Sequence, residues 1–146
     1  MFDFIWSPDG TRIAFTSEYA DSAEVFVVNS DGSDLRNLTN TEGFDIVRAW
    51  SPDGTQLVIN SHLALGSGSW STLIYRVDTV EEAPERLSTE LEEIITASWS
   101  PDGSQIAMLS SSGGSILDLY LSDANGDDVR RLTFEVGVTS FAWRPR

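Results

Sequence analysis

The stretch WSPDG occurs three times, at Trp6–Gly10, Trp50–Gly54 and Trp99–Gly103, and a worn copy, WRPR, stands at Trp143–Arg146. Successive tryptophans are 44, 49 and 44 residues apart. A period of about 40–50 residues is typical of architectures in which similar units stack on one another. The chain therefore divides into three full units, and the fourth copy of the stretch indicates one extra opening strand.

Each unit is expected to contain four short antiparallel strands. The first strand ends at the tryptophan, in DIVRAW, IITASW and VTSFAW. The Pro-Asp-Gly turn, in which proline fixes φ and glycine accepts a positive φ, leads to a second strand, RIAF, QLVI or QIAM. Because its apolar residues follow one another without alternation, both faces of this strand should be buried. The third strand, EVFVV, LIYRV or DLYLS, is followed by a short fourth one that ends in Leu-Thr or Leu-Ser.

Four-stranded antiparallel units at this period predict the blades of a β-propeller, and no window shows the 3.6-residue period of a helix. The blades are assigned to about residues 1–43, 44–93 and 94–137 of a single propeller segment, 1–146, with a closing strand at 138–146. The repeated tryptophans are interpreted as packing anchors between blades: Trp6, Trp50, Trp99 and Trp143. The predicted fold is all-β, with three four-stranded blades plus one extra innermost strand.

The order of WSPDGTRIAF and EVFVVNSDGSDLRNLT resembles the WD-like propeller repeat of TolB-type proteins over essentially the whole chain. The resemblance implies a six-bladed ring, of which this chain would be half. Similar propellers serve as periplasmic protein-interaction modules and as the non-catalytic gating domain of prolyl-oligopeptidase-like peptidases. The resemblance permits a periplasmic or extracellular location. No signal peptide is visible in MFDFIWSPDG, so the sequence does not identify the compartment.

Three blades leave two open flanks, because propellers close with about four to eight blades. Either the chain is a fragment of a longer propeller, or identical chains complete one another. Two chains related by a two-fold axis would close a six-bladed ring through two identical junctions, with VTSFAWRPR entering the neighbouring blade. At the junction, VTSFAWRPR competes with MFDFIW for the position of the first strand of that blade. A homodimer is the favoured expectation.

The charge narrows the classes of partner. The chain has 23 acidic residues and nine basic ones, all of them arginine, which gives a net charge of −14. Such a surface repels polyanions, so nucleic acid and anionic membranes are poor partners. No stretch approaches 18 consecutive apolar residues, so membrane insertion is not expected. Acidity serves solubility in the simplest interpretation, and attraction of a basic partner is the alternative.

One loop is out of step with the repeat. The second unit is longer between its tryptophan and the aromatic residue of its third strand, and the extra residues lie in Ser61–Thr72. This loop and the crossovers between blades should share one face of the propeller. The candidate binding residues on that face are Trp70, His62, Tyr19, Phe44, Asp45 and Glu42. The alternatives are that Trp70 packs on its own blade, that His62 is an ordinary loop histidine and that the acids form a solvated rim.

Motifs of enzymes are missing from the sequence. It contains neither G-x-S-x-G nor H-E-x-x-H, and a single histidine without cysteine cannot build a histidine or thiolate metal site. No catalytic residue, metal or cofactor is therefore predicted. We expect a non-enzymatic module that binds a protein or peptide, a basic one in particular, and self-associates. The alternatives are the non-catalytic propeller domain of a prolyl-oligopeptidase-like peptidase and a minimal propeller unit without a ligand.

Overall fold

The computed structural model describes residues 4–19, 21–40, 43–62, 70–76, 85–86, 91, 93–111 and 116–144, with only the backbone described at 19, 70–76 and 85–86. Its described residues form twelve strands and no helix, which confirms the all-β prediction. It follows that the described part of the chain offers no helix able to cross a membrane.

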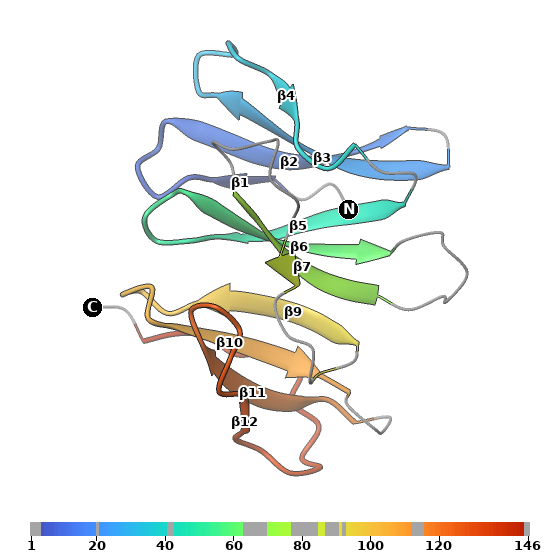
Figure 1. Cartoon of the computed structure of the whole chain (residues 1–146), viewed down its shortest axis with the longest axis vertical. Coiled ribbons are helices and arrows are strands. Elements are labelled where there is room, and N and C mark those ends of the chain that lie inside the picture. The colour runs from blue at the N-terminus through green and yellow to red at the C-terminus, as the bar shows by residue number, and fades with distance from the viewer. Residues whose placement is uncertain are drawn as a thin grey trace.

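The strands form three consecutive antiparallel meanders, which follow one another along the long axis of the molecule (Figure 1). A parallel pairing of Ala23 with Phe44 joins the first two meanders in one eight-stranded sheet, and the third is a separate four-stranded sheet. Unit 1 consists of β1 (Phe4–Trp6), β2 (Arg12–Tyr19), β3 (Ser22–Asn29) and β4 (Arg36–Asn37). Unit 2 consists of β5 (Phe44–Trp50), β6 (Gln56–His62), β7 (Trp70–Arg76) and β8 (Glu85–Arg86). Unit 3 consists of β9 (Ile94–Trp99), β10 (Gln105–Ser110), β11 (Asp118–Asp123) and β12 (Arg130–Arg131). Each first strand ends at its tryptophan, as the repeat predicts.

Among the residues that the structure describes, two hydrophobic cores lie between the units, and β6 belongs to both. Leu57 and Ile59 pack with Trp50, Val25 and Ala14 in the core between units 1 and 2. Val58, on the opposite face of β6, packs in the core between units 2 and 3, whose other members are Leu91, Ile94, Ala97, Trp99, Ile106, Met108 and Tyr120. A strand with cores on both sides needs apolar residues without alternation. The burial of β6 on both faces confirms the prediction for the second strand of unit 2.

Unit 1 differs from the other two because no other strand that the structure describes packs on one face of its sheet. Along β2, the buried residues Ala14 and Thr16 alternate with the partly exposed Ile13 and Phe15. The corresponding residues of β6 and β10 are buried on both faces. The prediction that the second strand is buried on both faces is therefore right for units 2 and 3 and wrong for unit 1, where Ile13 and Phe15 are only partly buried.

Residues 132–144, which follow β12, form no regular strand. The predicted closing strand nevertheless lies against unit 3, because the indole nitrogen of Trp143 donates a hydrogen bond to the carbonyl oxygen of Ser98 at 3.2 Å. Trp50 donates in the same way to the carbonyl oxygen of Ile5 at 3.2 Å. Residues 138–144, here called the C-terminal segment, thus lie beside β9 where the first strand of a following unit would lie, without the neighbouring strand that a ladder requires.

Candidate functional site

The three WSPDG stretches form the same hydrogen-bonded turn. In the first copy, the Ser7 hydroxyl donates to Asp9 Oδ1 at 2.6 Å and accepts from the Arg12 backbone N–H at 2.9 Å. The Thr11 N–H and hydroxyl also donate to Asp9 Oδ1. Gly10 closes the turn with a φ of 70°, which favours glycine. The same bonds recur around Asp53 and Asp102, so the motif is a turn, as predicted.

Hydrogen bonding to these carboxylates stabilises their charged form. The Ser7 hydroxyl is the largest cause and, together with Thr11, lowers the pKa of Asp9 to about 2. The pKa of Asp53 is lowered for the same reason, chiefly by Ser51. A carboxylate whose oxygen accepts from its own turn is a structural group, and its low pKa is explained without a catalytic role.

The turn between β3 and β4 lies beside this WSPDG turn, since the Ser30 N–H donates to the Thr11 carbonyl oxygen at 2.8 Å. At the other end of the strands, the Ala23 N–H donates to the Gly43 carbonyl oxygen at 3.2 Å. The β2–β3 turn and the crossover into β5 therefore share the opposite face of unit 1. For unit 1, this arrangement confirms the prediction that the loop between the second and third strands shares one face with the crossover.

Three candidate binding positions form one row across unit 2. His62 of β6 pairs with Phe44 of β5 on one side and with Trp70 of β7 on the other. Phe44 also pairs with Ala23 of β3, beside the turn that follows Tyr19. Directly paired residues of neighbouring strands lie close together, so the fold gathers four of the candidate positions at one edge. Phe44 is 44% exposed there.

The structure corrects the placement of Asp45, which was expected in an exposed crossover. Asp45 lies within β5, pairs with Ser61 and is fully buried. Successive residues of a strand point to opposite faces, so the exposure of Phe44 places Asp45 inward. Asp45 is therefore not part of a binding rim. Glu42 lies outside the described residues, and for Tyr19 and Trp70 the described part is the backbone.

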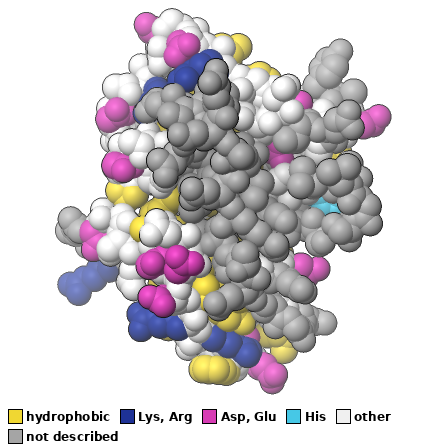
Figure 2. Space-filling model, in the orientation of Figure 1, with side chains coloured by type: hydrophobic (Ala, Val, Ile, Leu, Met, Phe, Trp, Pro, Cys, Tyr) yellow, Lys and Arg dark blue, Asp and Glu magenta, His cyan; other side chains and the backbone are white. Residues whose placement is uncertain are grey.

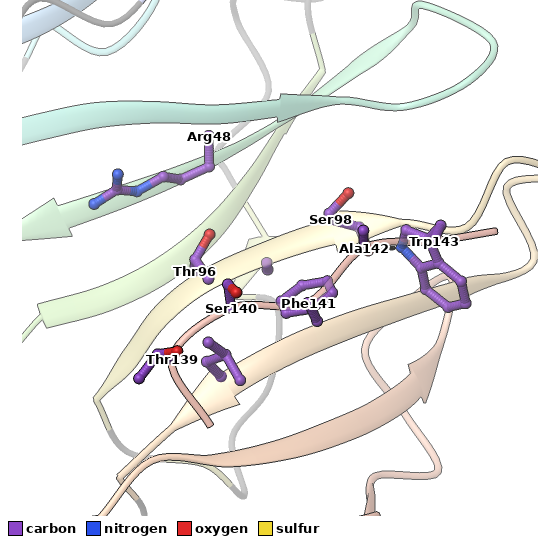
Figure 3. A pocket seen from close by; sticks show the side chains of 10 residues that line it. Arg48, Thr96, Ser98, Thr139, Ser140, Phe141, Ala142 and Trp143 are labelled. Carbon is purple, nitrogen blue, oxygen red and sulfur yellow. Dashed lines mark hydrogen bonds between the residues drawn. The ribbon is translucent and has the colours of Figure 1, made fainter. Parts of the chain in front are cut away.

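A groove that the sequence does not predict lies between β9 and the C-terminal segment. Its volume is about 280 Å³, and it is lined by Arg48, Thr96, Ala97, Ser98, Leu109 and residues 139–143. Arg48 sits at a β-bulge, where the pairing of β5 with β6 shifts between Val47 and Ala49. Figure 3 shows Arg48 above Thr96 of β9 and Ser140 of the C-terminal segment. The only sequence signal is an arginine where the other copies have Phe4, Ala97 and Phe141.

The outer strands of unit 3 are joined by a buried carboxylate. Asp118 is 2% exposed and accepts hydrogen bonds from the Arg131 guanidinium, the Thr133 hydroxyl at 2.8 Å and the Glu135 N–H at 3.1 Å. Burial raises the pKa of Asp118, but these three donors outweigh that effect and hold the pKa below its usual range. The Arg131 guanidinium also lies 5.0 Å from the centre of the Phe134 ring.

We expect Asp118→Asn to lower the melting temperature at pH 7 by roughly 5 °C, because an amide accepts weaker hydrogen bonds and leaves Arg131 without its counter-charge. A lowered pKa in the folded state stabilises above the unfolded pKa and ceases to stabilise as pH falls through the folded value. The difference between variant and parent should therefore shrink below about pH 4. Thermal unfolding at pH 7, 5 and 3 measures it, and a difference independent of pH would contradict the assignment.

An apolar face of unit 1 is open to solvent. Cross-strand pairing aligns Phe4, Phe15 and Phe26 in one row, and Trp6, Ile13 and Val28 in the next. The rings of Phe15 and Phe26 stack with their centroids 5.8 Å apart. Trp6 is 50% exposed, whereas Trp50 and Trp99 are 8% and 5% exposed in the cores between units. The open face of unit 1 thus corresponds to the face by which units 2 and 3 pack on the unit before them.

The junction between units 1 and 2 shows which contacts this face makes when it is covered. The Trp50 indole donates to the Ile5 carbonyl oxygen, and the Arg12 guanidinium lies 5.3 Å from the centre of the Trp50 ring. Arg12 also donates to the Gly54 carbonyl oxygen at 2.7 Å. At the far end of unit 3, Trp143 repeats the indole hydrogen bond. The two ends of the molecule therefore carry the two halves of one type of junction.

Comparisons with known proteins agree with this architecture. A family model described as the TolB beta propeller domain matches residues 4–145. The Tol-Pal system protein TolB of Anaeromyxobacter dehalogenans is 39% identical over 49 residues, which cover 34% of this chain and 11% of that protein. The crystal structure of TolB from Acinetobacter baumannii superposes with a TM-score of 0.72 and 25% identity, over 88% of this chain and 31% of that one.

Peptidases share the fold as well. A structure from a study of two prolyl endopeptidases superposes with a TM-score of 0.71 over 94% of this chain and 22% of that one. Its 20% identity shows a common fold alone. This chain therefore spans a minor part of the length of each of these proteins.

Proposed function

Because the chain belongs to the TolB beta propeller domain family, we propose that it is a non-enzymatic binding module that completes its ring with a second copy of itself. Its completed ring presents the face of the β2–β3 turns and crossovers to a protein or peptide. Both parts of the proposal start from surfaces that the fold exposes.

The observation that carries self-association is the open apolar face of unit 1. Trp6, Phe4 and their neighbours occupy positions that are buried in units 2 and 3. A large exposed apolar patch on a soluble protein is typical of an interaction site. The surface that fits it is the far side of a third unit, because that is what each repeat of this type packs on. Two chains provide two such junctions and six units.

The mass in solution tests the proposal. Light scattering coupled to gel filtration at micromolar concentration should give twice the chain mass of 16.0 kDa. Since each chain carries a charge of −14, added salt should strengthen the association by screening the repulsion between copies. Repulsion between charges is already screened beyond ~10 Å at about 0.1 M salt. A protein that stays monomeric up to about 0.5 M salt would therefore contradict self-association.

Binding of a basic peptide is supported by charge and by the aromatic row. The protein is strongly acidic, and Phe44 is exposed at the edge where Phe44, His62 and Trp70 pair. An exposed ring offers a cation–π contact to arginine or lysine, and the net negative charge of the chain attracts a basic peptide.

A labelled lysine- and arginine-rich dodecapeptide and an acidic peptide of the same length serve as probes. Fluorescence anisotropy should show binding of the basic peptide alone, and Phe44→Ala should weaken it about three- to tenfold, the loss typical of one cation–π contact. Leu35→Ala is the matched control, because Leu35 is an exposed apolar residue at the β3–β4 turn on the opposite face. Equal binding of both peptides, or equal losses in both variants, would contradict the assignment of this face.

The alternative is the non-catalytic propeller domain of a prolyl-oligopeptidase-like peptidase. Its support is the shared fold with the prolyl endopeptidase structure. Self-association separates the two proposals, because a propeller domain within a longer chain closes its ring with its own blades.

A further inference from the structure

Within the proposed self-association, the geometry points to strand exchange: the C-terminal segment of one copy replaces β1 of the second copy and pairs with its β2. This inference rests on the proposed function. It adds that the C-terminal segment of one copy, and not β1 of the second copy, occupies the position next to β2 of the second copy. The partner is a second copy of this chain.

The first support is that the C-terminal segment already lies in that place. The hydrogen bond from Trp143 to the Ser98 carbonyl oxygen repeats the bond from Trp50 to the Ile5 carbonyl oxygen, with the same length of 3.2 Å. Residues 139–143 line one groove with Leu109 of β10, which is 2% exposed. A unit that packs on this end of unit 3 therefore meets its own first strand already in position. Its β1 has to give way, or the segment has to leave.

The second support is the correspondence between the two strands. Counted back from the tryptophans, Phe141 and Phe4 occupy one position of the repeat, and Ala142 and Ile5 the next. Small residues also precede Trp50 and Trp99, namely Ala49 and Ser98, so alanine fits that position. The exchanged strand would thus present phenylalanine and tryptophan to the same neighbours as β1.

The register of the exchanged pair follows from β1. Trp6 pairs with Ile13, Ile5 with Ala14 and Phe4 with Phe15. Trp50 and Trp99 pair with Leu57 and Ile106, the residues equivalent to Ile13. By the same register, Trp143 of one copy lies opposite Ile13 of the other, and Ala142 lies opposite Ala14.

The third support is charge. Residues 130–146 carry four arginines and one glutamate, whereas residues 1–34 carry seven carboxylates and one arginine. In the view of Figure 2, the arginine side chains gather mainly at the unit 3 end of the molecule. Strand exchange brings the basic end of one acidic chain to an acidic part of the next, which favours this contact.

Strand exchange also places the Arg48 groove at the junction between copies. The wall made by residues 139–143 would become part of a sheet that continues into the second copy. Arg48, Thr96 and Ser98 of one chain would then face a groove whose other side is fixed by its partner. The groove is complete only in the assembly.

Paired cysteines test the exchange, since the sequence has no cysteine of its own. Directly opposite residues of antiparallel strands have Cα atoms about 4.5–5.5 Å apart, within the range of a disulfide. Under mild oxidation, Ala14→Cys with Ala142→Cys should form a disulfide between chains, seen as a dimer band on a non-reducing gel. The matched pair, Ile5→Cys with Ala14→Cys, reports β1 in its own chain and should stay largely reduced at concentrations where the dimer prevails.

If a cysteine variant folds poorly, the dimer affinity of two tryptophan variants tests the exchange instead. Trp143→Ala should weaken the dimer at least about 100-fold, because the indole lies at the centre of the junction. Trp6→Ala should weaken it less than about threefold, because β1 is displaced in the exchanged dimer. Circular dichroism checks that both variants keep their strands.

The outcomes separate the two proposals. A wild-type protein that is monomeric throughout contradicts self-association and the exchange with it. A dimer in which Ile5→Cys links to Ala14→Cys within one chain, and in which Trp6→Ala is the damaging variant, overturns the exchange and leaves self-association standing. A disulfide between positions 14 and 142 within one monomer overturns the exchange too, because it shows that three units close on themselves.

Discussion

Replacing Trp50 by alanine should lower the free energy of unfolding by about 3–5 kcal/mol, the usual loss for a buried tryptophan. Trp50 is 8% exposed, packs in the core between units 1 and 2, and donates a hydrogen bond to the Ile5 carbonyl oxygen. The substitution leaves a cavity, an unpaired carbonyl oxygen and an Arg12 guanidinium without the ring that it covers.

Trp6→Ala is the matched control, since Trp6 occupies the same position of the repeat and is 50% exposed. Its loss should be about 1 kcal/mol in the monomer. Urea unfolding at low protein concentration, followed by the fluorescence of the remaining tryptophans, measures both variants. Equal losses would show that the face of unit 1 is covered within its own chain, and would contradict the open face.

The second large effect is expected at Ile106, which pairs with Trp99. Ile106 pairs with Trp99, is fully buried and packs with Met108 in the core between units 2 and 3. Ile106→Ala should cost about 2–5 kcal/mol, because it removes three carbon atoms from a close-packed core that can relax only in part.

Ile13→Ala is the control, because Ile13 pairs with Trp6 and is only partly buried. Its cost should be about 1 kcal/mol in the monomer and should rise in the dimer, where the face of unit 1 is covered. Urea unfolding at two protein concentrations, below and above dimerisation, distinguishes the two states. A cost of Ile13→Ala that does not depend on concentration would count against a partner on this face.

Much of the fold follows from the sequence because its signals are local. The WSPDG turn is closed by hydrogen bonds between residues at most five positions apart, from Ser7 to Arg12, so the letters themselves specify it. The period of the tryptophans then orders the strands of each unit. The face opposite the WSPDG turns was also predictable, since alternate turns of a meander lie at opposite ends of its strands.

Burial could not be predicted in the same way. Asp45 looked like an acid of an exposed crossover, but it pairs within β5 and shares the buried face of that strand with Val47, because residues two apart in a strand lie on one face. The groove beside Arg48 depends on a bulge in β5 and on a segment about 90 residues away in sequence. Neither leaves a mark in the pattern of apolar residues.

The sequence by itself determined the repeat, the turns, the all-β class and the tryptophan at the end of each first strand. Those features rest on hydrogen bonds and backbone preferences within a few residues. Only the tertiary structure decided which copies of a repeated face are covered, because burial comes from a neighbouring unit more than 40 residues away. Trp6 and Trp50 share their five-letter setting, and one is exposed while the other is buried, since only Trp50 packs in a core between two described units.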